Sequence, residues 1–271
     1  MGDAVQNSMG QIGRQWLTVV AVVMAIAVNA LSNFFPPAGQ NIGQISNTTF
    51  SDVLITPAGY AFAIWGLIYI GLIAFSLYQA LPAQRQQADI AQAAQWLIGA
   101  CLLQMVWVYV FLLSLFWLSV VLMFGILFCL ANAYLRTRAE TVVPRRKNRW
   151  LFQAPFSVYF GWITVAAVVN VASALTVTVQ AGSSALSMGA IAWTIVMMTI
   201  SAGIAATVAL RYDDAAFPMV AVWALCAIAV RQSAVVPIAF VGIALSVGLV
   251  CIIVRVQGVA RRSRREPSSP T

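Results

Sequence analysis

Three apolar stretches of this sequence carry aromatic and amide side chains at helical spacing. Residues three, four or seven positions apart share one face of a helix, and each stretch has such a face. The three sets are Phe62, Trp65 and Tyr69; Gln104, Trp107 and Phe111; and Tyr159, Trp162, Ala166 and Asn170. A deeply buried Trp needs a partner for its indole N–H or a place beside a polar ligand, so these faces could line a ligand pocket. They could equally be packing contacts, with Gln104, Asn132 and Asn170 joining neighbouring helices.

The residue types that perform most metal and acid–base chemistry are absent or poorly placed. The sequence has no His, which is the commonest metal ligand and neutral-pH general base. Its cysteines lie singly in apolar stretches without CxxC spacing. We interpret Asp213 and Asp214 as solvated loop charges. We therefore expect no catalytic residue, no metal site and no cofactor. The apolar stretches also lack internal charges, which disfavours a proton-coupled pump.

The stretches that carry these side chains are long enough to cross a membrane. Hydrophobic residues make up 62% of the chain and charged residues 8%, against about a quarter charged in a soluble domain. A spanning helix needs about 20 apolar residues. Stretches of about this length lie at residues 16–32, 57–79, 93–113, 116–135, 154–177, 188–210, 218–230 and 235–254. The third and fourth divide at Ser114, and the seventh is short. The sequence thus predicts an all-α, polytopic integral membrane helix bundle with about eight transmembrane helices.

Basic residues mark one side of the predicted bundle. With eight helices, every Lys and Arg except Arg231 falls before the first helix, in alternate loops or after the last helix. Cytoplasmic loops collect basic residues, so we expect both termini in the cytoplasm and the protein in a bacterial inner membrane. The net charge of +8 then reflects topology in a lipid bilayer and not nucleic-acid binding. The first stretch could also be a signal peptide that is cleaved near Ala30, but we interpret it as a helix.

The polar segments suggest how the chain is divided. Residues 1–15 would form a cytoplasmic N-terminal segment, and residues 257–271, which are basic and then rich in Pro and Ser, a disordered cytoplasmic tail. The long outer segment 33–52 could be a lid or a solvated connector. In the sixth helix, Ser201, Ala205 and Ala209 are spaced four apart. Such small residues permit close packing, either inside the protein or in a homodimer.

Two of the stretches resemble motifs of the tryptophan-rich sensory protein family (TspO/MBR), which is related to the mitochondrial translocator protein. The second helix starts with a Pro followed by Phe, Trp and Tyr, in TPAGYAFAIWGLIY at residues 56–69. The fifth has a Trp, small residues and an Asn, in GWITVAAVVN at residues 161–170. In the third helix, Val108 and Phe111 replace an Asn and a Trp of the family pattern. The resemblance implies a five-helix TspO-like core at residues 16–177, followed by a three-helix C-terminal extension at residues 178–256.

The resemblance also implies a pocket that opens to the outer side, is roofed by the first loop and binds tetrapyrroles or other apolar ring compounds. Its residues correspond to Phe62, Trp65, Tyr69, Trp162, Ala166 and Asn170, to which the helical faces add Gln104, Trp107 and Phe111. Counted from the outer helix ends, Trp65, Trp107 and Asn170 lie at one depth, roughly 10 to 12 Å below the surface.

We therefore expect a membrane-embedded binding protein or sensor for a hydrophobic ring ligand, such as a protoporphyrin. Because no His could hold haem iron, we favour a metal-free ring. The alternative is a small-molecule transporter in which the extra helices complete a path, with Pro218 and Pro237 as signs of interrupted helices. A porphyrin-degrading enzyme is the less favoured third possibility, because no acid–base pair is visible.

Overall fold

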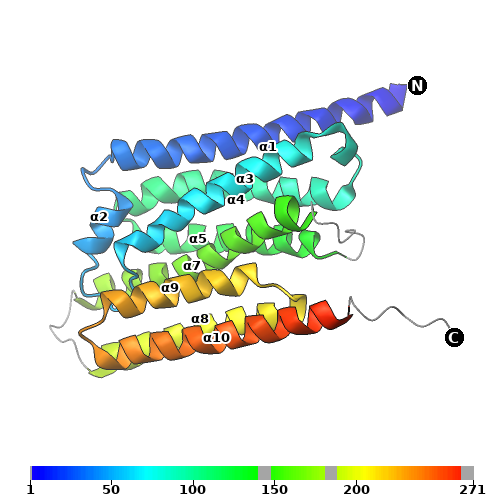
Figure 1. Ribbon diagram of the computed structural model, residues 1–271. Helices are drawn as coiled ribbons and strands as arrows, with labels where there is room; N and C mark the ends of the chain where they lie inside the picture. The colour runs from blue at the N-terminus through cyan, green and yellow to red at the C-terminus, as the bar shows by residue number, and fades with distance from the viewer. Residues whose placement is uncertain (1, 140–147, 181–187, 264–271) are drawn as a thin grey trace.

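The computed structural model describes residues 2–139, 148–180 and 188–263, and within them the chain is helical without any strand (Figure 1). The α-helices are α1 Gly2–Phe34, α2 Ile42–Asn47, α3 Ile64–Ala80, α4 Ala88–Leu112, α5 Phe116–Thr137, α7 Ala154–Gln180, α8 Met188–Tyr212, α9 Ala216–Arg231 and α10 Val236–Ser263. Two short 3-10 helices, η1 Gly59–Ala63 and η2 Pro82–Gln84, precede α3 and α4, and a π-helical turn, η3 Arg149–Gln153, precedes α7.

Most of these helices have the length and composition of membrane spans. Among the described residues, seven helices are long and apolar enough to cross a membrane, and α9 is shorter, with 16 residues. A helix of that length rises about 24 Å, less than the roughly 30 Å of the hydrocarbon core. Large apolar side chains such as Phe128 and Phe240 are exposed on the surface of the helix bundle, as a lipid environment allows. The predicted all-α membrane bundle, including its short seventh helix, is confirmed.

The division between the third and fourth predicted helices lies at a tight turn. α4 ends at Leu112, α5 begins at Phe116, and Ser114 between them has a φ of 61°. Its amide donates to the carbonyl of Phe111, and the Leu115 amide donates to that of Val110. These bonds pair carbonyls that the end of α4 would otherwise leave open, so the chain reverses at the predicted residue.

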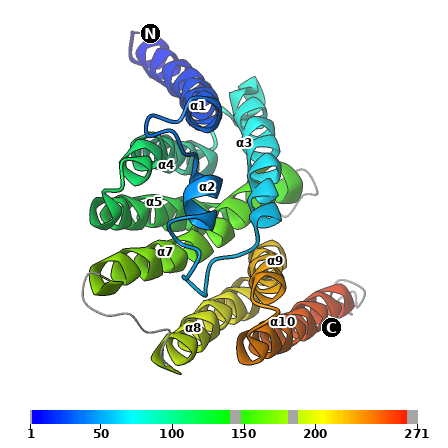
Figure 2. The same cartoon turned by 90° about the vertical axis from the view of Figure 1, so that its left-hand side faces the viewer.

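The first five long helices surround a common interior. Among the described helices, α1, α4, α5, α7 and α3 pack in a closed ring, each against the next and α3 against α1. α9 packs on the outside of this ring against α7, and α8 and α10 pack against α9 and against each other (Figure 2). The α7–α9 contact is close because Gly161 has no side chain: a Cβ there would lie 3.1 Å from the carbonyl oxygen of Phe217. The last three helices therefore form a second layer on one side of the ring.

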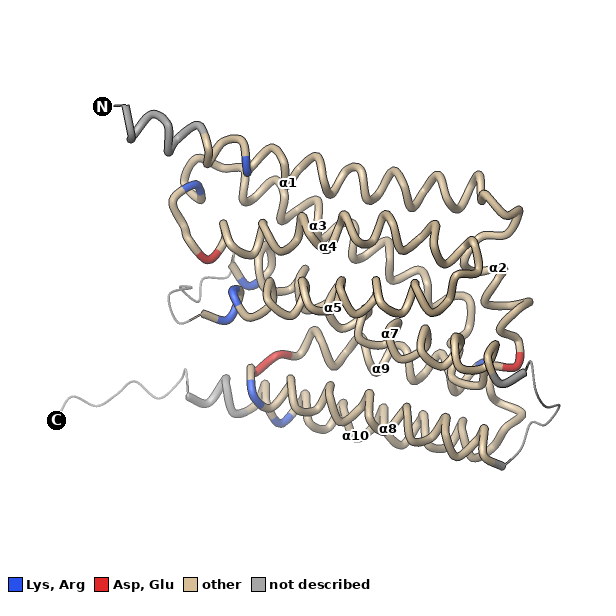
Figure 3. Tube along the Cα trace, turned by 180° about the vertical axis from the view of Figure 1, so that it is seen from behind, with Lys and Arg blue, Asp and Glu red and all other residues tan. Residues whose placement is uncertain are grey.

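Charge separates the two ends of the bundle. In the part of the chain that the structure describes, basic residues gather at the end where α1 begins and α10 finishes (Figure 3). Arg231 is an exception, because it ends α9 and contacts Asn47 in the loop at the other end. Five basic residues that we assigned to the charged end lie outside the described residues: Arg145, Arg146, Lys147, Arg264 and Arg265. The tail prediction needs a correction, because α10 continues to Ser263 and so includes residues 257–263. Ala260 and two arginines favour continued helix there; residues 264–271 lie outside the described residues.

Asp214 is not a solvated loop charge, as we expected, but a buried one. It is 4% exposed, and its carboxylate lies 2.8 Å from a guanidinium nitrogen of Arg138. The Tyr134 hydroxyl and the Ala216 amide also donate to it, at 2.9 and 2.8 Å, and Arg138 donates to Ser157 at 2.9 Å. Buried charges persist only when they are paired and hydrogen-bonded. This network ties the α8–α9 turn to α5 and α7, and thus the second layer to the ring.

The small residues of α8 face the protein interior. Ser201, Ala205 and Ala209 are buried, and α8 packs against α9 and α10. Of the two explanations for this spacing, the structure supports close internal packing. The stripe gives no reason to expect a homodimer.

We predict that Asp214→Asn lowers the free energy of unfolding by about 3 kcal/mol, because it leaves the partly buried Arg138 without its counter-charge. Asp213→Asn is the matched control. Asp213 is exposed and has a φ of 50°, which Asn also adopts, so its effect should stay within about 0.5 kcal/mol. Thermal unfolding in detergent measures both effects. Equal effects of the two substitutions would contradict the stabilising role of the Asp214–Arg138 ion pair.

Candidate ligand-binding site beneath the first loop

The segment between α1 and α3 is folded, and we call residues 41–57 the lid. It contains α2, which begins with a capping box: the Gln44 amide donates to the Asn41 side chain, and the Asn41 amide donates to the Gln44 side chain. Beyond α2, the Phe50, Val53 and Thr56 amides donate to carbonyls three to five residues earlier. The lid covers the end of the ring opposite the basic end (Figure 2). Of the two alternatives for this loop, the structure supports a lid.

An aromatic side chain attaches the lid to the ring. Phe50 is 2% exposed, and its ring centroid lies 6.1 Å from that of Phe111 and 5.0 Å from that of Phe116. Aromatic pairs at such distances add about 0.5–1.5 kcal/mol beyond the burial of their area. Phe50 thereby holds the lid against the turn between α4 and α5.

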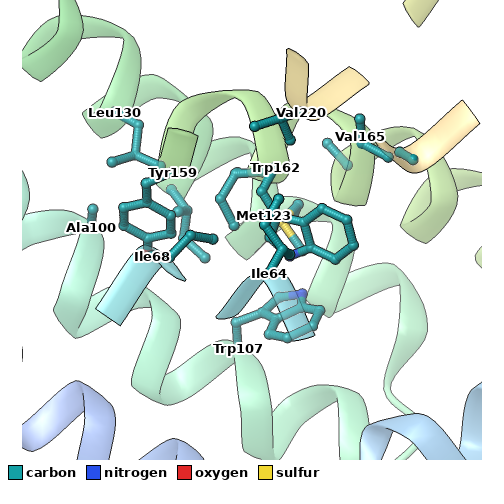
Figure 4. Close-up of a cluster of buried hydrophobic side chains, with 14 of the residues drawn as sticks. Ile64, Ile68, Ala100, Trp107, Met123, Leu130, Tyr159, Trp162, Val165 and Val220 are labelled. Carbon is teal, nitrogen blue, oxygen red and sulfur yellow. The ribbon is translucent and has the colours of Figure 1, made fainter. Parts of the chain in front are cut away.

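A cavity of about 70 Å³ lies between the lid and the ring. Its lining is almost entirely apolar, and none of the described residues that line it is charged. The lid contributes Ile42, Ser46, Phe50, Thr56 and Pro57; η1, α4 and α7 contribute Phe62, Trp107, Phe111, Trp162, Val165, Ala166, Val169, Asn170 and Ser173. Figure 4 shows Trp107 and Trp162 reaching this part of the core from α4 and α7. Six of the nine residues that the sequence analysis named as candidate ligand-binding residues therefore line the cavity.

Asn170 joins three helices at one depth. Its side-chain oxygen accepts from the Trp107 indole at 3.2 Å, and its amide nitrogen donates to the Ser119 hydroxyl at 2.9 Å. Ser119 lies on α5, and its side chain is fully buried. Asn170 thus joins α7 to α4 and α5, as the packing explanation expects, and it also lines the cavity.

Three polar atoms at the cavity lack a partner among the described residues. They are the indole Nε1 of Trp162 and the hydroxyl oxygens of Ser46 and Thr56. Trp162 is held edge-on against Phe62, with ring centroids 6.0 Å apart. An unpaired buried polar group costs about 1–3 kcal/mol, so a molecule that hydrogen-bonds here would relieve that penalty.

Trp65 and Tyr69 lie outside the cavity lining. They stack on each other with centroids 5.5 Å apart, and Trp65 also packs on Tyr159. Phe62 precedes them in the 3-10 helix η1, where side chains three positions apart eclipse. Phe62 packs on Trp162 and Trp65 on Tyr159, which lie one turn apart on α7. Of Phe62, Trp65 and Tyr69, only Phe62 lines the cavity.

Gln104 is also outside the cavity lining. It is 2% exposed, and neither atom of its amide group has a hydrogen-bond partner among the described residues. It thus makes no interhelical bond there.

The lid residues Ile42, Ser46 and Phe50 were missed, although the capping pattern Asn41-x-x-Gln44 could have indicated the helix that carries Ile42 and Ser46. Val169 and Ser173 extend the Trp162–Ala166 face at the same helical spacing, which was the available signal for them.

We predict that Asn170→Ala lowers the free energy of unfolding by about 2 kcal/mol, because Trp107 and Ser119 lose a shared partner in a buried position. Asn132→Ala is the control, since the half-buried Asn132 donates, among the described residues, only to the carbonyl of Phe128 in its own helix. Denaturation followed by circular dichroism measures both. Equal losses for the two variants would show that Asn170 does not join the helices.

Comparison with known proteins places this architecture in a family. The family described as TSPO-like protein matches residues 15–255, which includes the ring, the lid and nearly all of the second layer. The family pattern therefore extends beyond the five helices that the motifs indicated. No curated protein and no solved structure matches the chain. With a match that runs through all eight predicted helices, the chain belongs to the TSPO-like family of integral membrane proteins.

Proposed function

We propose that the chain is a membrane-embedded binding protein that captures a hydrophobic ring compound, of the tetrapyrrole class, in the cavity beneath the lid. The observation that carries the proposal is the cavity itself. Aromatic and aliphatic side chains line it, and three of the lining residues, Trp162, Ser46 and Thr56, have a buried polar atom without a hydrogen-bond partner among the described residues. A mostly apolar pocket with a few polar groups is the usual form of a small-molecule site.

The size and charge of the cavity define how such a ligand would bind. Its volume of about 70 Å³ is well below the 300–1,000 Å³ of typical ligand pockets, so the lid and Phe50 must move outward to admit a tetrapyrrole. Since no charged residue among those described lines the cavity, the macrocycle would occupy the apolar interior. Any carboxylate substituents would point toward the lid end and water.

The two prolines that suggested interrupted helices, and hence transport, do not break the described part of either helix. Pro218 and Pro237 lie in the first turns of α9 and α10, where a missing amide hydrogen costs little. Both helices run without a break between their described ends. Binding is therefore better supported than transport.

Protoporphyrin IX provides the direct test of the site. We expect saturable quenching of tryptophan fluorescence in the purified protein, and we expect Ala166→Phe to abolish it by filling the cavity. Trp162→Phe should weaken binding up to about tenfold, since it removes one hydrogen-bond donor.

Trp65→Phe is the control, because Trp65 lies outside the cavity lining, and its affinity should equal that of wild type. If wild type and Ala166→Phe bind the porphyrin equally well, the ring does not occupy this cavity.

We also propose that the lid end faces the outside of a bacterial inner membrane and that the basic end faces the cytoplasm, in accord with the positive-inside rule. Ser51 and Gln86 are exposed near the two ends. A membrane-impermeant maleimide should label Ser51→Cys in intact spheroplasts and Gln86→Cys only after permeabilisation. The reverse pattern would overturn this orientation.

A further inference from the structure

The second layer contacts the lid through the last turn of α9. Arg231, the final residue of α9, donates to the Asn47 side-chain oxygen at 2.9 Å, the Ser46 carbonyl at 3.1 Å and the Pro57 carbonyl at 3.3 Å. The Ser46 carbonyl lies in the last turn of α2, where helices leave carbonyls unpaired. One guanidinium, with its five N–H groups in a fixed fork, thus connects α2 to the far end of the lid.

The same helix also fixes the segment into which the lid leads. The Ala58 amide donates to the Ala227 carbonyl at 3.1 Å, and the Trp223 indole donates to the Ala61 carbonyl at 3.1 Å. Tyr60 packs edge-on against Trp223, with ring centroids 5.3 Å apart. Every described contact in this set joins α9 to residues 58–61, directly before the cavity residue Phe62.

The position of Arg231 in the charge pattern is unusual. The other described basic side chains lie at the opposite end of the bundle (Figure 3), so topology does not account for an arginine here. A cation at the C-terminal end of a helix is favourable, but any basic residue would provide that. The fork that reaches three acceptors on the lid is specific to arginine.

We propose that Arg231 is a positioning residue of the ligand site: it holds the lid closed over the cavity, so that the second layer sets how fast ligand enters and leaves. The effect on ligand entry and release rests on the proposed function, whereas closure of the lid by Arg231 is a property of the ligand-free protein. Phe50 attaches the lid to α4 and α5, and Arg231 attaches it on the α9 side. Opening requires the release of both attachments.

Hydrogen–deuterium exchange of the ligand-free protein tests the closure. Arg231→Ala should raise exchange of the lid amides of Ile45, Thr48 and Phe50 roughly tenfold, which corresponds to about 1.4 kcal/mol, and leave the ring helices unchanged. Arg231→Lys should fall between wild type and Arg231→Ala, because an ammonium group reaches fewer acceptors. Arg255→Ala, at an exposed arginine of α10, is the matched control and should leave lid exchange unchanged.

A second pair of variants identifies the partner. Asn47→Ala removes one acceptor and should raise lid exchange by less than Arg231→Ala does. The double variant Asn47→Ala/Arg231→Ala should exchange no faster than Arg231→Ala alone, because the two residues share one interaction. Additive effects, unchanged lid exchange in Arg231→Ala, or an equal rise in every helix would each overturn the proposal.

Protoporphyrin IX dissociation separates this inference from the proposed function. If wild type binds the porphyrin, Arg231→Ala should release it about tenfold faster; an unchanged release rate would refute the positioning role. If wild type does not bind it, the proposed function fails for this ligand, while the exchange experiment still decides whether Arg231 closes the lid.

Discussion

Hydrocarbon offers no hydrogen-bond partner, and this constraint governs both the backbone and the polar side chains of the protein. The backbone satisfies it by forming helices, and several polar side chains satisfy it by bonding to one another. Asn170 pairs with Trp107 and Ser119 beneath the lid, and Asp214 pairs with Arg138 near the basic end. Since lipid drives helix association only weakly, these few bonds do much to fix how the helices are rotated and which side chains face the interior.

The two ends of the bundle use their polar groups differently. At the basic end, the Asp214 carboxylate pairs with Arg138 and accepts from Tyr134 and Ala216, and it joins the second layer to the ring. At the lid end, the bonds of Arg231 connect a short loop to a single helix turn, and the cavity below retains unpaired atoms at Trp162 and Thr56. The ion pair at the basic end favours a rigid structure there. A binding site that opens instead needs contacts that can break, such as those of Arg231, above polar groups that a ligand can bind.

The parts of this architecture that depend on local sequence were predictable. The length of a membrane span predicted the turn at Ser114. Counting residues from the helix ends predicted that Trp107 and Asn170 lie at one depth, and the two side chains are hydrogen-bonded. The remaining features depend on contacts between distant segments. Spacing alone does not reveal that Phe62 lines the cavity while Trp65 does not, nor the pairing of Asp214 with an arginine far away in the chain. The lid residue Phe50 carries no pattern that indicates its place against Phe111.

The central claim is that a ring compound binds beneath the lid and between α4 and α7. An experimental structure of the protein with protoporphyrin IX bound would test it most directly. Our account predicts the macrocycle against Trp162, Ala166 and Asn170, with Phe50 displaced from Phe111 and the cavity enlarged. A porphyrin on the lipid-facing surface, with the cavity closed as described here, would contradict it.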